Sequence, residues 1–368
     1  MSSFAIFRLP HADSCTLVKQ QQGEPAVLHS LVQLNGRRGF VIAPFAVSRQ
    51  CPVVIISPDS VQQLPLDGTP LPMLHCCLAA TDVCEPAAVS PDVDENYAAD
   101  FTCFHQALLA GQFQKLVLAR SIATPRHADA DPVLLFQNAC QLYPRLFIAL
   151  VSTPQTGTWL VATPEVLLQQ EDCRWRSIAL AGTMQLTPDE LSGEGERRTW
   201  AEKDIREQRY VASFIAQALQ RLGIDYEEQG PRTVRAANLV HLRSDFLFSL
   251  DQKWNQRLGD LLAALHPTPA VCGLPREKAQ RFILDNEHSP RSYYSGFMGP
   301  LAIGKQPGRE SATQVYVTLR CMQVTEKTYR LFAGGGLLAD SRLQTEWEET
   351  EAKLYTMNRL IQTSAASK

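Results

Sequence analysis

Hydrophobic residues recur along this chain with two different periods, and each period predicts a different element. Runs in which apolar residues alternate with polar ones, or continue without interruption for a few positions, indicate strands. Before residue 60 these runs are VLHSLVQL, RRGFVIAPF and CPVVIIS, which together predict a meander. Later runs that predict strands are FQKLVLARSIAT, RLFIALVST, GTWLVATP, EVLLQQ, QVYVTLRCMQV and KTYRLFAGG.

Apolar residues spaced by three and four positions predict helices between these strands. One helix follows Glu95 and ends at Gly111, and the next begins at Pro132 with Asp131 as its cap. Strands and helices that mix without regular alternation predict an α+β fold. No low-complexity linker divides the chain, so we expect a single domain over 1–368. Within it, 1–94 would be a variable part of the sheet, 60–93 mostly irregular connection, and 95–362 the working core.

The last helix carries acids on its buried face. Glu346, Glu349, Lys353, Met357 and Leu360 are spaced by three and four residues, so they share one side of the helix. This side is apolar at its C-terminal end and acidic at its N-terminal end. Carboxylates that face a core need a cation, donors or a raised pKa. The alternative is a solvated acidic first turn that complements the helix dipole.

A second helix, in RTWAEKDIREQRYVASFIAQALQRL, repeats this arrangement. One apolar stripe runs along it and, extended back by one turn, reaches Glu207. The stripe consists of Val211, Phe214, Ile215, Ala218 and Leu222. Two helices that each direct a carboxylate inward suit a hard divalent cation such as Mg2+. The alternative is an exposed Glu207 paired with Lys203 or Arg206 on its own helix.

Four further polar residues lie within apolar runs. Lys115 either protects an exposed strand edge or is a buried amine that can act as a base. Glu165 follows a Thr-Pro turn, and a carboxyl group in such an apolar setting can serve as an acid. His241 is either a hydrogen-bonded core residue or a catalyst. Arg320 ends a strand and is suited to bind a carboxylate with two hydrogen bonds.

Two loops can place backbone groups near a ligand. The glycines of AGGG, residues 334–336, break the strand KTYRLFAGG and permit close approach of the backbone. Their spacing matches neither a P-loop nor a dinucleotide fingerprint. The proline-rich loop HPTPAVCGLP begins at His266 and is either a ligand loop or a simple turn.

Composition narrows the classes of function. The chain has 368 residues, 45% of them hydrophobic, and a net charge of −3, which is typical of a globular protein without a basic surface for nucleic acid or membrane. No apolar run is long enough to span a bilayer, and the N-terminus does not resemble a secretion signal. The ten cysteines form no CxxC pair. We therefore expect reduced thiols and a cytoplasmic location.

Taken together, the motifs resemble a known family. LVLAR, ATPE, LAGT, EKDIREQ, VHL, HPTPAVCGLP, YYSGFMG, VTLRC, LFAGGG and EWEETEAK follow one another as in the isochorismate synthases of the chorismate-utilising enzymes, which are related to anthranilate synthase component I. The resemblance covers 95–360 and only loosely the residues before. It implies a twisted antiparallel β-sandwich core flanked by helices, with the site in a deep central cleft.

The resemblance also implies roles for individual residues. Mg2+ would be held by Glu207 and Glu349, with Glu346 close by. The ring carboxylate of chorismate would bind Mg2+, the backbone at 181–183 and Lys353, and the enolpyruvyl carboxylate would bind Arg320 and the Gly334 amide. The residues implied in substrate binding are Ala181, Gly182, Thr183, His241, Tyr294, Arg320, Gly334 and Lys353.

Two positions indicate the chemistry. Lys115 resembles the lysine of the water-adding members, and Ala181 replaces the lysine of the PIKGT motif of aminodeoxychorismate synthases. Lys115 would activate water for attack at C2, and Glu165 would protonate the departing C4 hydroxyl. The product would be isochorismate, for menaquinone or siderophore biosynthesis. The resemblance implies a monomer without a glutamine amidotransferase subunit.

Two alternatives remain open at this point. A salicylate synthase would go on to expel pyruvate; YYSG is closer to its spelling, whereas HPTPAVCGLP favours an isochorismate synthase. A non-catalytic homologue would bind chorismate without turnover, but it would be expected to lose at least one of Lys115, Glu165 and the metal glutamates.

Overall fold

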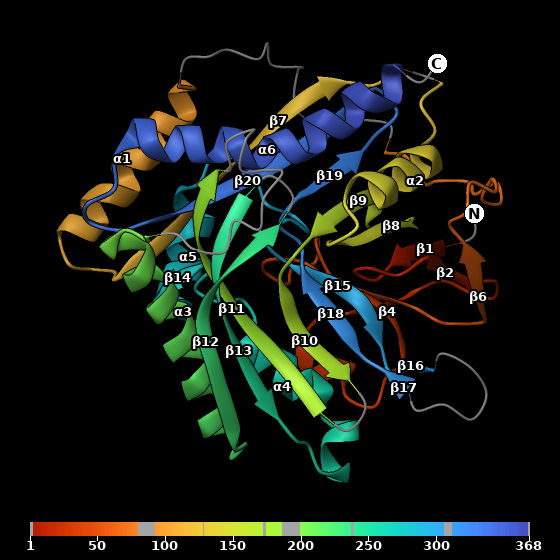
Figure 1. Ribbon diagram of the computed structural model, residues 1–368, viewed down its shortest axis with the longest axis horizontal. Coiled ribbons are helices and arrows are strands. Elements are labelled where there is room, and N and C mark those ends of the chain that lie inside the picture. Colours follow the sequence, from red (N-terminus) through yellow and green to blue (C-terminus); the bar gives the residue numbers. More distant parts are fainter. Residues whose placement is uncertain are drawn as a thin grey trace.

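Two large antiparallel sheets pack face to face in the computed structural model, which describes residues 3–79, 93–127, 129–171, 174–185, 199–236, 239–304 and 311–366 (Figure 1). The first sheet has the order β14 (Gly273–Leu274), β7 (Lys115–Pro125), β20 (Thr328–Leu337), β19 (Cys321–Val324), β9 (Gly157–Thr163), β8 (Phe147–Thr153), β1 (Ser3–Arg8), β2 (Ser14–Gln20) and β6 (Ser60–Pro65). The second has the order β12 (Tyr226–Ala236), β13 (Leu239–Phe248), β11 (Arg174–Gln185), β10 (Val166–Glu171), β18 (Gln314–Val317), β15 (Phe297–Leu301), β4 (Gly39–Ala43), β5 (Val53–Ile56) and β3 (Ala26–Leu28). A short hairpin, β16 (Ile303–Gly304) with β17 (Ser311–Ala312), lies outside both.

Apolar side chains from both sheets fill the space between them. Phe7 of β1 contacts Phe40 of β4, and Phe147 of β8 stacks on Tyr316 of β18 with ring centroids 4.2 Å apart. Each strand contributes alternate residues to this layer, because successive side chains of a strand point to opposite faces. The predicted α+β sandwich is confirmed.

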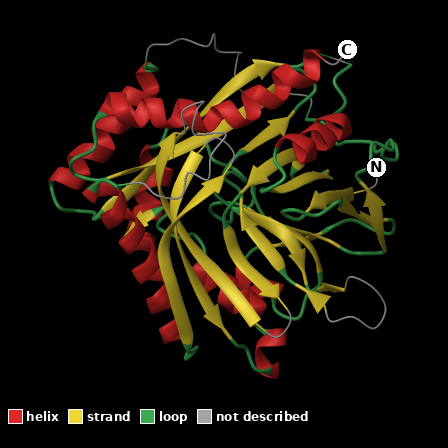
Figure 2. Cartoon of the chain, viewed as in Figure 1, coloured by secondary structure: helices red, strands yellow, loops and turns green. Residues whose placement is uncertain are grey.

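The helices cover the outer faces of the sheets and one end of the sandwich (Figure 2). The helix α3 (Glu202–Arg221) and the short α4 (Leu258–Leu265) pack on the second sheet, while α2 (Pro132–Leu142) and α6 (Leu343–Ala366) pack on the first. A further core beside β7 joins α1 (Glu95–Leu109) to α5 (Arg276–Asn286). No helix among the described residues is long and apolar enough to cross a membrane.

The N-terminal residues belong to both sheets. Strands β1, β2 and β6 lengthen the first sheet, and β3, β4 and β5 lengthen the second. Two predictions for this part were wrong. The run VLHSLVQL forms only the three-residue strand β3 and then a 3-10 helix, Leu31–Leu34, because its apolar residues do not alternate after Leu28. The segment after residue 60 is not wholly irregular, since β6 pairs with β2 at the sheet edge. Residues 80–92 lie outside the described residues.

Two of the predicted strands differ in the structure: one is divided between the two sheets, and the other is longer than predicted. QVYVTLRCMQV is two strands, β18 in the second sheet and β19 in the first, because the chain passes between the sheets at 318–320. Conversely, the three glycines do not break their strand. β20 continues through them, and Gly334, Gly335 and Gly336 pair in register with residues 117–119 of β7.

The predicted helices formed where their caps indicated. The Asp131 carboxylate accepts a hydrogen bond from the Val133 amide at the start of α2, and α1 ends just before Gly111. Local patterns did not predict α4, α5 or the long strands β12 and β13. Helix α5 and strand β12 carry many polar residues, so their periodicity is weak, whereas α4 is a short apolar run and β13 is buried along most of its length.

Candidate active site

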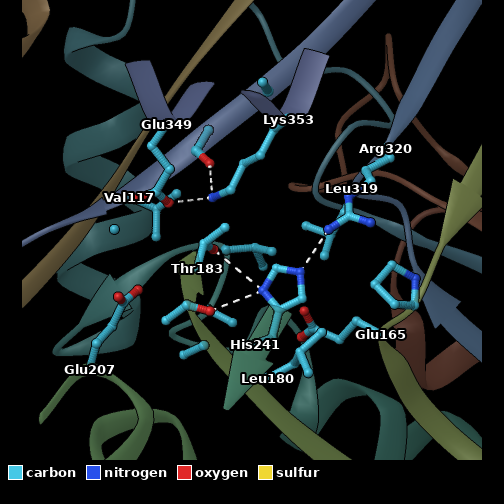
Figure 3. A pocket seen from close by; sticks show the side chains of 18 of the residues that line it. Val117, Glu165, Leu180, Thr183, Glu207, His241, Leu319, Arg320, Glu349 and Lys353 are labelled. Atoms are coloured by element: carbon cyan, nitrogen blue, oxygen red, sulfur yellow. Dashed lines mark hydrogen bonds and ion pairs between the residues drawn. The ribbon is translucent and has the colours of Figure 1, made fainter. Parts of the chain in front are cut away.

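A cavity between the two sheets collects most of the residues singled out above (Figure 3). The empty space between its walls is about 640 Å³. It is lined by Val117, Pro164, Glu165, Leu180, Ala181, Gly182, Thr183, Glu207, His241, Ala270, Val271, Tyr294, Leu319, Arg320, Ala333, Gly334, Gly336, Glu349 and Lys353. These residues come from both sheets and from α3 and α6, so only the folded chain brings them together.

Two crossovers between the sheets form one wall of the cavity. The chain passes from β9 to β10 at Pro164 and Glu165, and from β18 to β19 at 318–320. The crossovers run side by side, since the Val317 amide donates to the Glu165 carbonyl (2.9 Å) and the Ala162 amide to the Arg320 carbonyl (2.8 Å). Leaving a sheet lets a side chain turn into the space that the sheet would otherwise fill. This is why Glu165 and Arg320 both line the cavity.

Glu165 is held in an apolar environment. Its side chain is 1% exposed, and its Oε1 has no hydrogen-bond partner among the described residues. Burial raises the pKa of the Glu165 carboxyl to about 8, against a smaller lowering by the positive charges of Lys115 and Lys353. A carboxyl group in this state keeps its proton at neutral pH and can donate it to a leaving group.

His241 and Arg320 form a hydrogen-bonded pair in the same wall. An Arg320 guanidinium nitrogen donates to His241 Nε2 (2.7 Å), because arginine has no acceptor atom. His241 Nδ1 therefore carries the proton, and it donates to the Gly182 carbonyl at 3.0 Å. Burial, followed by the charge of Arg320, lowers the pKa of His241 well below its usual value. The imidazole is neutral, and it holds the guanidinium at the cavity wall (Figure 3).

A bulge in β11 presents backbone to the cavity. The register of β11 with β13 shifts between Ala181 and Met184, and Gly182 has a φ of +69°. Glycine adopts this left-handed conformation without strain. The bulge turns Ala181, Gly182 and Thr183 toward the cavity instead of leaving them in the sheet ladder.

The opposite wall contains an acid cluster, which we define as Glu207 of α3 with Glu346 and Glu349 of α6. Each of these carboxylates contacts a lysine. Glu207 pairs with Lys115 (2.7 Å), Glu349 with Lys353 (2.7 Å), and Glu346 with Lys203. Lys353 also donates to the Gly334 carbonyl at 2.8 Å. The predicted alternative for Glu207 was wrong, since Lys203 and Arg206 of its own helix pair with residues elsewhere.

The glycines of β20 make room for this cluster. A Cβ on Gly336 would lie 2.1 Å from the Glu207 Oε1, and one on Gly334 would lie 2.8 Å from the Tyr294 hydroxyl. A Cβ on Gly335 would lie 3.3 Å from the Glu346 Oε2. The carboxylates of α3 and α6 therefore lie close to the backbone of β20, in space that larger side chains on β20 would occupy.

The lysines set the charge of the acids. Burial is the largest influence on the pKa of Glu207 and would raise it, but the charge and hydrogen bond of Lys115, together with the charges of Lys353 and Lys203, hold this pKa below its usual value. Burial, followed by the charge of Glu349, raises the pKa of Glu346. Sequence reasoning missed Asp204, one turn before Glu207. Burial and then the charges of Glu207 and Glu349 raise the pKa of Asp204 to about 6.

The acid cluster has the donor chemistry that a hard cation requires. Its oxygens belong to carboxylates, and the Glu346 Oε2 is buried without a hydrogen-bond partner among the described residues. In the part of the chain that the structure describes, no three His, Cys, Asp or Glu side chains are already arranged around one point. Mg2+ commonly binds one or two carboxylates and completes its shell with water and substrate oxygens. The residues present therefore fit Mg2+.

Eleven of the thirteen predicted site residues line the cavity, and the other two lie directly behind it. Lys115 is 0% exposed and pairs through β7 with strands on both sides, so it does not protect a sheet edge. Glu346 is also buried and contacts the cavity wall through the Gly335 backbone. The acidic first turn of α6 is thus not simply solvated. Glu348, off the buried stripe, is exposed as expected.

His266 lies in a buried turn outside the cavity lining. Its Nε2 contacts the Pro44 carbonyl at 3.1 Å, and burial lowers its pKa to about 4. The HPTP loop nevertheless contributes Ala270 and Val271 to the cavity. These two apolar residues, together with Leu180 and Leu319, were not predicted, because nothing in their local sequence separates them from core residues.

Comparisons with known proteins place this site in a family. The family model for chorismate binding enzymes matches residues 85–362. Isochorismate synthase EntC from Escherichia coli K12 is 31% identical over 249 residues, which cover 67% of this chain and 62% of EntC. Isochorismate synthase DhbC from Bacillus subtilis 168 is 32% identical over 262 residues, which cover 68% of this chain and 64% of DhbC. Both alignments thus span less than two thirds of the relatives' own lengths.

The fold is also that of a solved relative. The structure of MenF, the menaquinone-specific isochorismate synthase from Escherichia coli, has a TM-score of 0.73 with 21% identity and covers 98% of this chain and 88% of that chain. At this identity the likeness shows the fold alone. The family model, however, matches well over half of the sequence, and the matched region contains every residue of the cavity. This chain belongs to the family of chorismate binding enzymes.

Proposed function

We propose that this protein is an isochorismate synthase, which isomerises chorismate to isochorismate reversibly and with Mg2+. The observation that carries the proposal is that a proton donor and an amine lie beside one cavity. Glu165 keeps its proton because it is buried and its Oε1 has no hydrogen-bond partner among the described residues, and Lys115 lies near enough for its charge to act on that carboxyl group. Family membership and the isochorismate synthase activity printed for the aligned relatives support the same reaction.

Two sets of polar groups in the cavity suit the two carboxylates of chorismate. Arg320, held in place by His241, would bind the enolpyruvyl carboxylate together with the Gly334 amide and Tyr294. Lys353 and the bulged backbone around Gly182 would bind the ring carboxylate. Binding of both carboxylates would orient the ring between Lys115 and Glu165.

The chemistry requires one proton to be taken and one to be given. Lys115 is charged while it pairs with Glu207 and would act as the base after it has given up a proton: as the free amine it would remove a proton from water as the water oxygen bonds to ring C2. The ring double bonds shift, the C4–O bond breaks, and Glu165 protonates the departing hydroxyl, which leaves as water. One water is consumed and one released, so substrate and product are isomers. In the reverse direction, Glu165 takes the proton and Lys115 returns it.

The acid cluster supplies the metal ligands in this proposal. Glu207 and Glu349 would hold Mg2+, with Glu346 close by. When bound, the ion would anchor the ring carboxylate and offset its negative charge. Glu349→Ala should therefore weaken Mg2+ binding, measured by calorimetry, and unchanged Mg2+ dependence of turnover would contradict this assignment.

A salicylate synthase is the alternative from the same family, and a non-catalytic chorismate-binding protein is the alternative from another class. The second is disfavoured because Glu165 remains a buried acid with a raised pKa, which binding alone does not need. The pathway, menaquinone or siderophore, and the monomeric state stay predictions. So does the cytoplasmic location, with which the described cysteines agree, since none of them forms a disulfide.

The proposal is tested by NMR of the purified protein incubated with chorismate, with and without Mg2+. An equilibrium mixture of chorismate and isochorismate, formed only with Mg2+, is the expected result. Salicylate and pyruvate would identify a salicylate synthase instead. Chorismate binding without any conversion would identify the non-catalytic protein.

A further inference from the structure

Lys203 is a partly buried cation beside the acid cluster, and the proposed reaction has no use for it. It lies on α3, four residues before Glu207, and its ammonium contacts the Glu346 carboxylate of α6. Its side chain is 25% exposed, whereas that of Glu346 is 1% exposed. Lys115 and Lys353 pair with the other two acids, but each also has a place in the proposed chemistry. Among the described residues, Lys203 forms its ion pair with the acid cluster alone.

This contact joins two helices that otherwise belong to different cores. The apolar stripe of α3 packs on the second sheet, and that of α6 packs on the first. The same two regions are linked a second time by Arg206 of α3 and Asp340, just before α6 (2.8 Å). That second pair is exposed, with 43% and 57% of the side chains accessible. The chain thus offers two ion pairs between the same two regions, one with a buried carboxylate and one exposed to water.

The Lys203–Glu346 pair neutralises a buried negative charge. A carboxylate at the position of Glu346 is costly unless a cation neutralises it. The three acids of the cluster carry three negative charges, and Lys115, Lys203 and Lys353 carry three positive ones. The cluster is therefore balanced from within. A divalent cation that enters it must take carboxylate oxygens that ammonium groups already contact.

We infer that Lys203 is the displaceable counter-ion of Glu346: it neutralises this carboxylate while no divalent cation is bound, and it competes with the cation for it. The inference rests on the proposed function only in that a divalent cation binds the acid cluster. Its consequence has a definite sign. A lysine that served only to hold α3 against α6 would favour metal binding, whereas a competing lysine opposes it.

Calorimetric titration of the purified protein with Mg2+, without substrate, shows whether Lys203 favours or opposes Mg2+ binding. Lys203→Met should bind Mg2+ about tenfold more tightly than the unaltered protein, because the competing charge is gone. Arg206→Met is the matched control. It removes a positive charge from the same helix and breaks the exposed pair, and its Mg2+ affinity should change less than about twofold, because exposed pairs are screened by water.

Thermal unfolding gives a second measurement on the same proteins. Without Mg2+, Lys203→Met should melt at a lower temperature, since Glu346 has lost its counter-ion, and saturating Mg2+ should raise its Tm more than that of the unaltered protein. Arg206→Met should show neither change. Lys203→Gln, which keeps a hydrogen-bond donor for Glu346, should show the same higher Mg2+ affinity if Lys203→Met folds poorly.

Equal or weaker Mg2+ binding by both Lys203 variants would overturn the inference and leave the proposed function standing. Binding by neither the unaltered protein nor the variants would overturn the inference together with the metal assignment. Tighter binding by both variants, with Arg206→Met unchanged, would support the competing lysine.

Discussion

Glu165 and Glu207 are both glutamates at the wall of one cavity, yet the structure gives them different protonation states. Burial raises the pKa of Glu165 to about 8, so this carboxyl group keeps its proton. Burial acts on Glu207 in the same direction, but its ion pair with Lys115, together with the charges of Lys353 and Lys203, outweighs burial and lowers the pKa. The difference lies in the partner and not in the residue type. An isolated buried acid becomes a proton donor, and a paired one remains an anion.

The elements explain how the two environments arise. Glu165 lies at a crossover between the sheets. The backbone groups there already bond one another: the Val317 amide donates to the Glu165 carbonyl, and the Ala162 amide donates to the Arg320 carbonyl. Glu207 stands on α3 above the glycines of β20, where the lysine of β7 and the acids of α6 also converge. The cavity therefore has one wall with a neutral acid beside the Arg320 guanidinium and another wall of ion pairs. A substrate bound between them meets the proton of Glu165 on one side and the acid cluster with its lysines on the other.

Removal of Lys115 should have the largest effect, because it takes away the proposed base and the counter-ion of Glu207 together. Lys115→Met should lower kcat by roughly 10⁴ while chorismate binding is largely retained. Steady-state turnover and calorimetric binding of chorismate measure the two quantities. Near-normal turnover would exclude Lys115 as the base.

Glu165→Gln keeps the shape of the neutral acid and removes its proton donor. We expect kcat to fall by roughly 10³ with little change in substrate binding. In the unaltered protein, kcat should decline as pH rises past about 8, where Glu165 loses its proton, and this decline should be absent from the residual activity of the variant. The exposed Glu348→Gln on α6 is the control. Persistent turnover of Glu165→Gln would mean that the proton comes from another group.

Two glycine variants test whether β20 shapes the ionic wall. Gly336→Ala would place a Cβ 2.1 Å from the Glu207 Oε1, so the Lys115–Glu207 pair must shift, and we expect kcat/KM to fall by roughly a hundredfold. Gly335→Ala, with its Cβ 3.3 Å from Glu346, should cost much less. Equal effects of the two variants in steady-state assays would contradict the proposed close approach.

The smallest effect concerns stability and its dependence on pH. The pKa of Glu165 is raised on folding, so its contribution is fully present below its unfolded pKa of 4.5 and is lost as pH rises to about 8. Glu165→Gln does not titrate, so it should gain stability relative to the unaltered protein over this interval, by up to a few kcal/mol. Denaturant titrations at pH 5 and pH 8.5 measure this difference, and a constant difference would show that Glu165 does not carry the shift.

The sequence predicted the acids better than their partners. The spacing of Glu346 and Glu349, and the extension of an apolar stripe to Glu207, followed from helical periodicity alone. Their lysines could not be predicted in this way, because Lys115 and Lys203 reach the acids from another strand and another helix. Sequence distance carries no information on such contacts. The same reason explains the wrong pairing expected for Glu207.

Local sequence patterns also did not predict the crossovers between the sheets. QVYVTLRCMQV is mostly apolar, so its pattern predicts one strand, and nothing in it marks the passage from β18 to β19. The prediction that the three glycines break their strand was also wrong. Glycines normally weaken a strand, but β7 pairs with them across its full length, and this pairing outweighs the local preference.

The sequence by itself determined the fold class, the helices that carry acids, the family and the residue types at the site, because periodicity and motif order are properties of the chain alone. The tertiary structure decided which carboxyl group stays neutral and which is ionised. Protonation depends on burial and on charges a few ångströms away, and both are set by segments that lie far apart in the sequence.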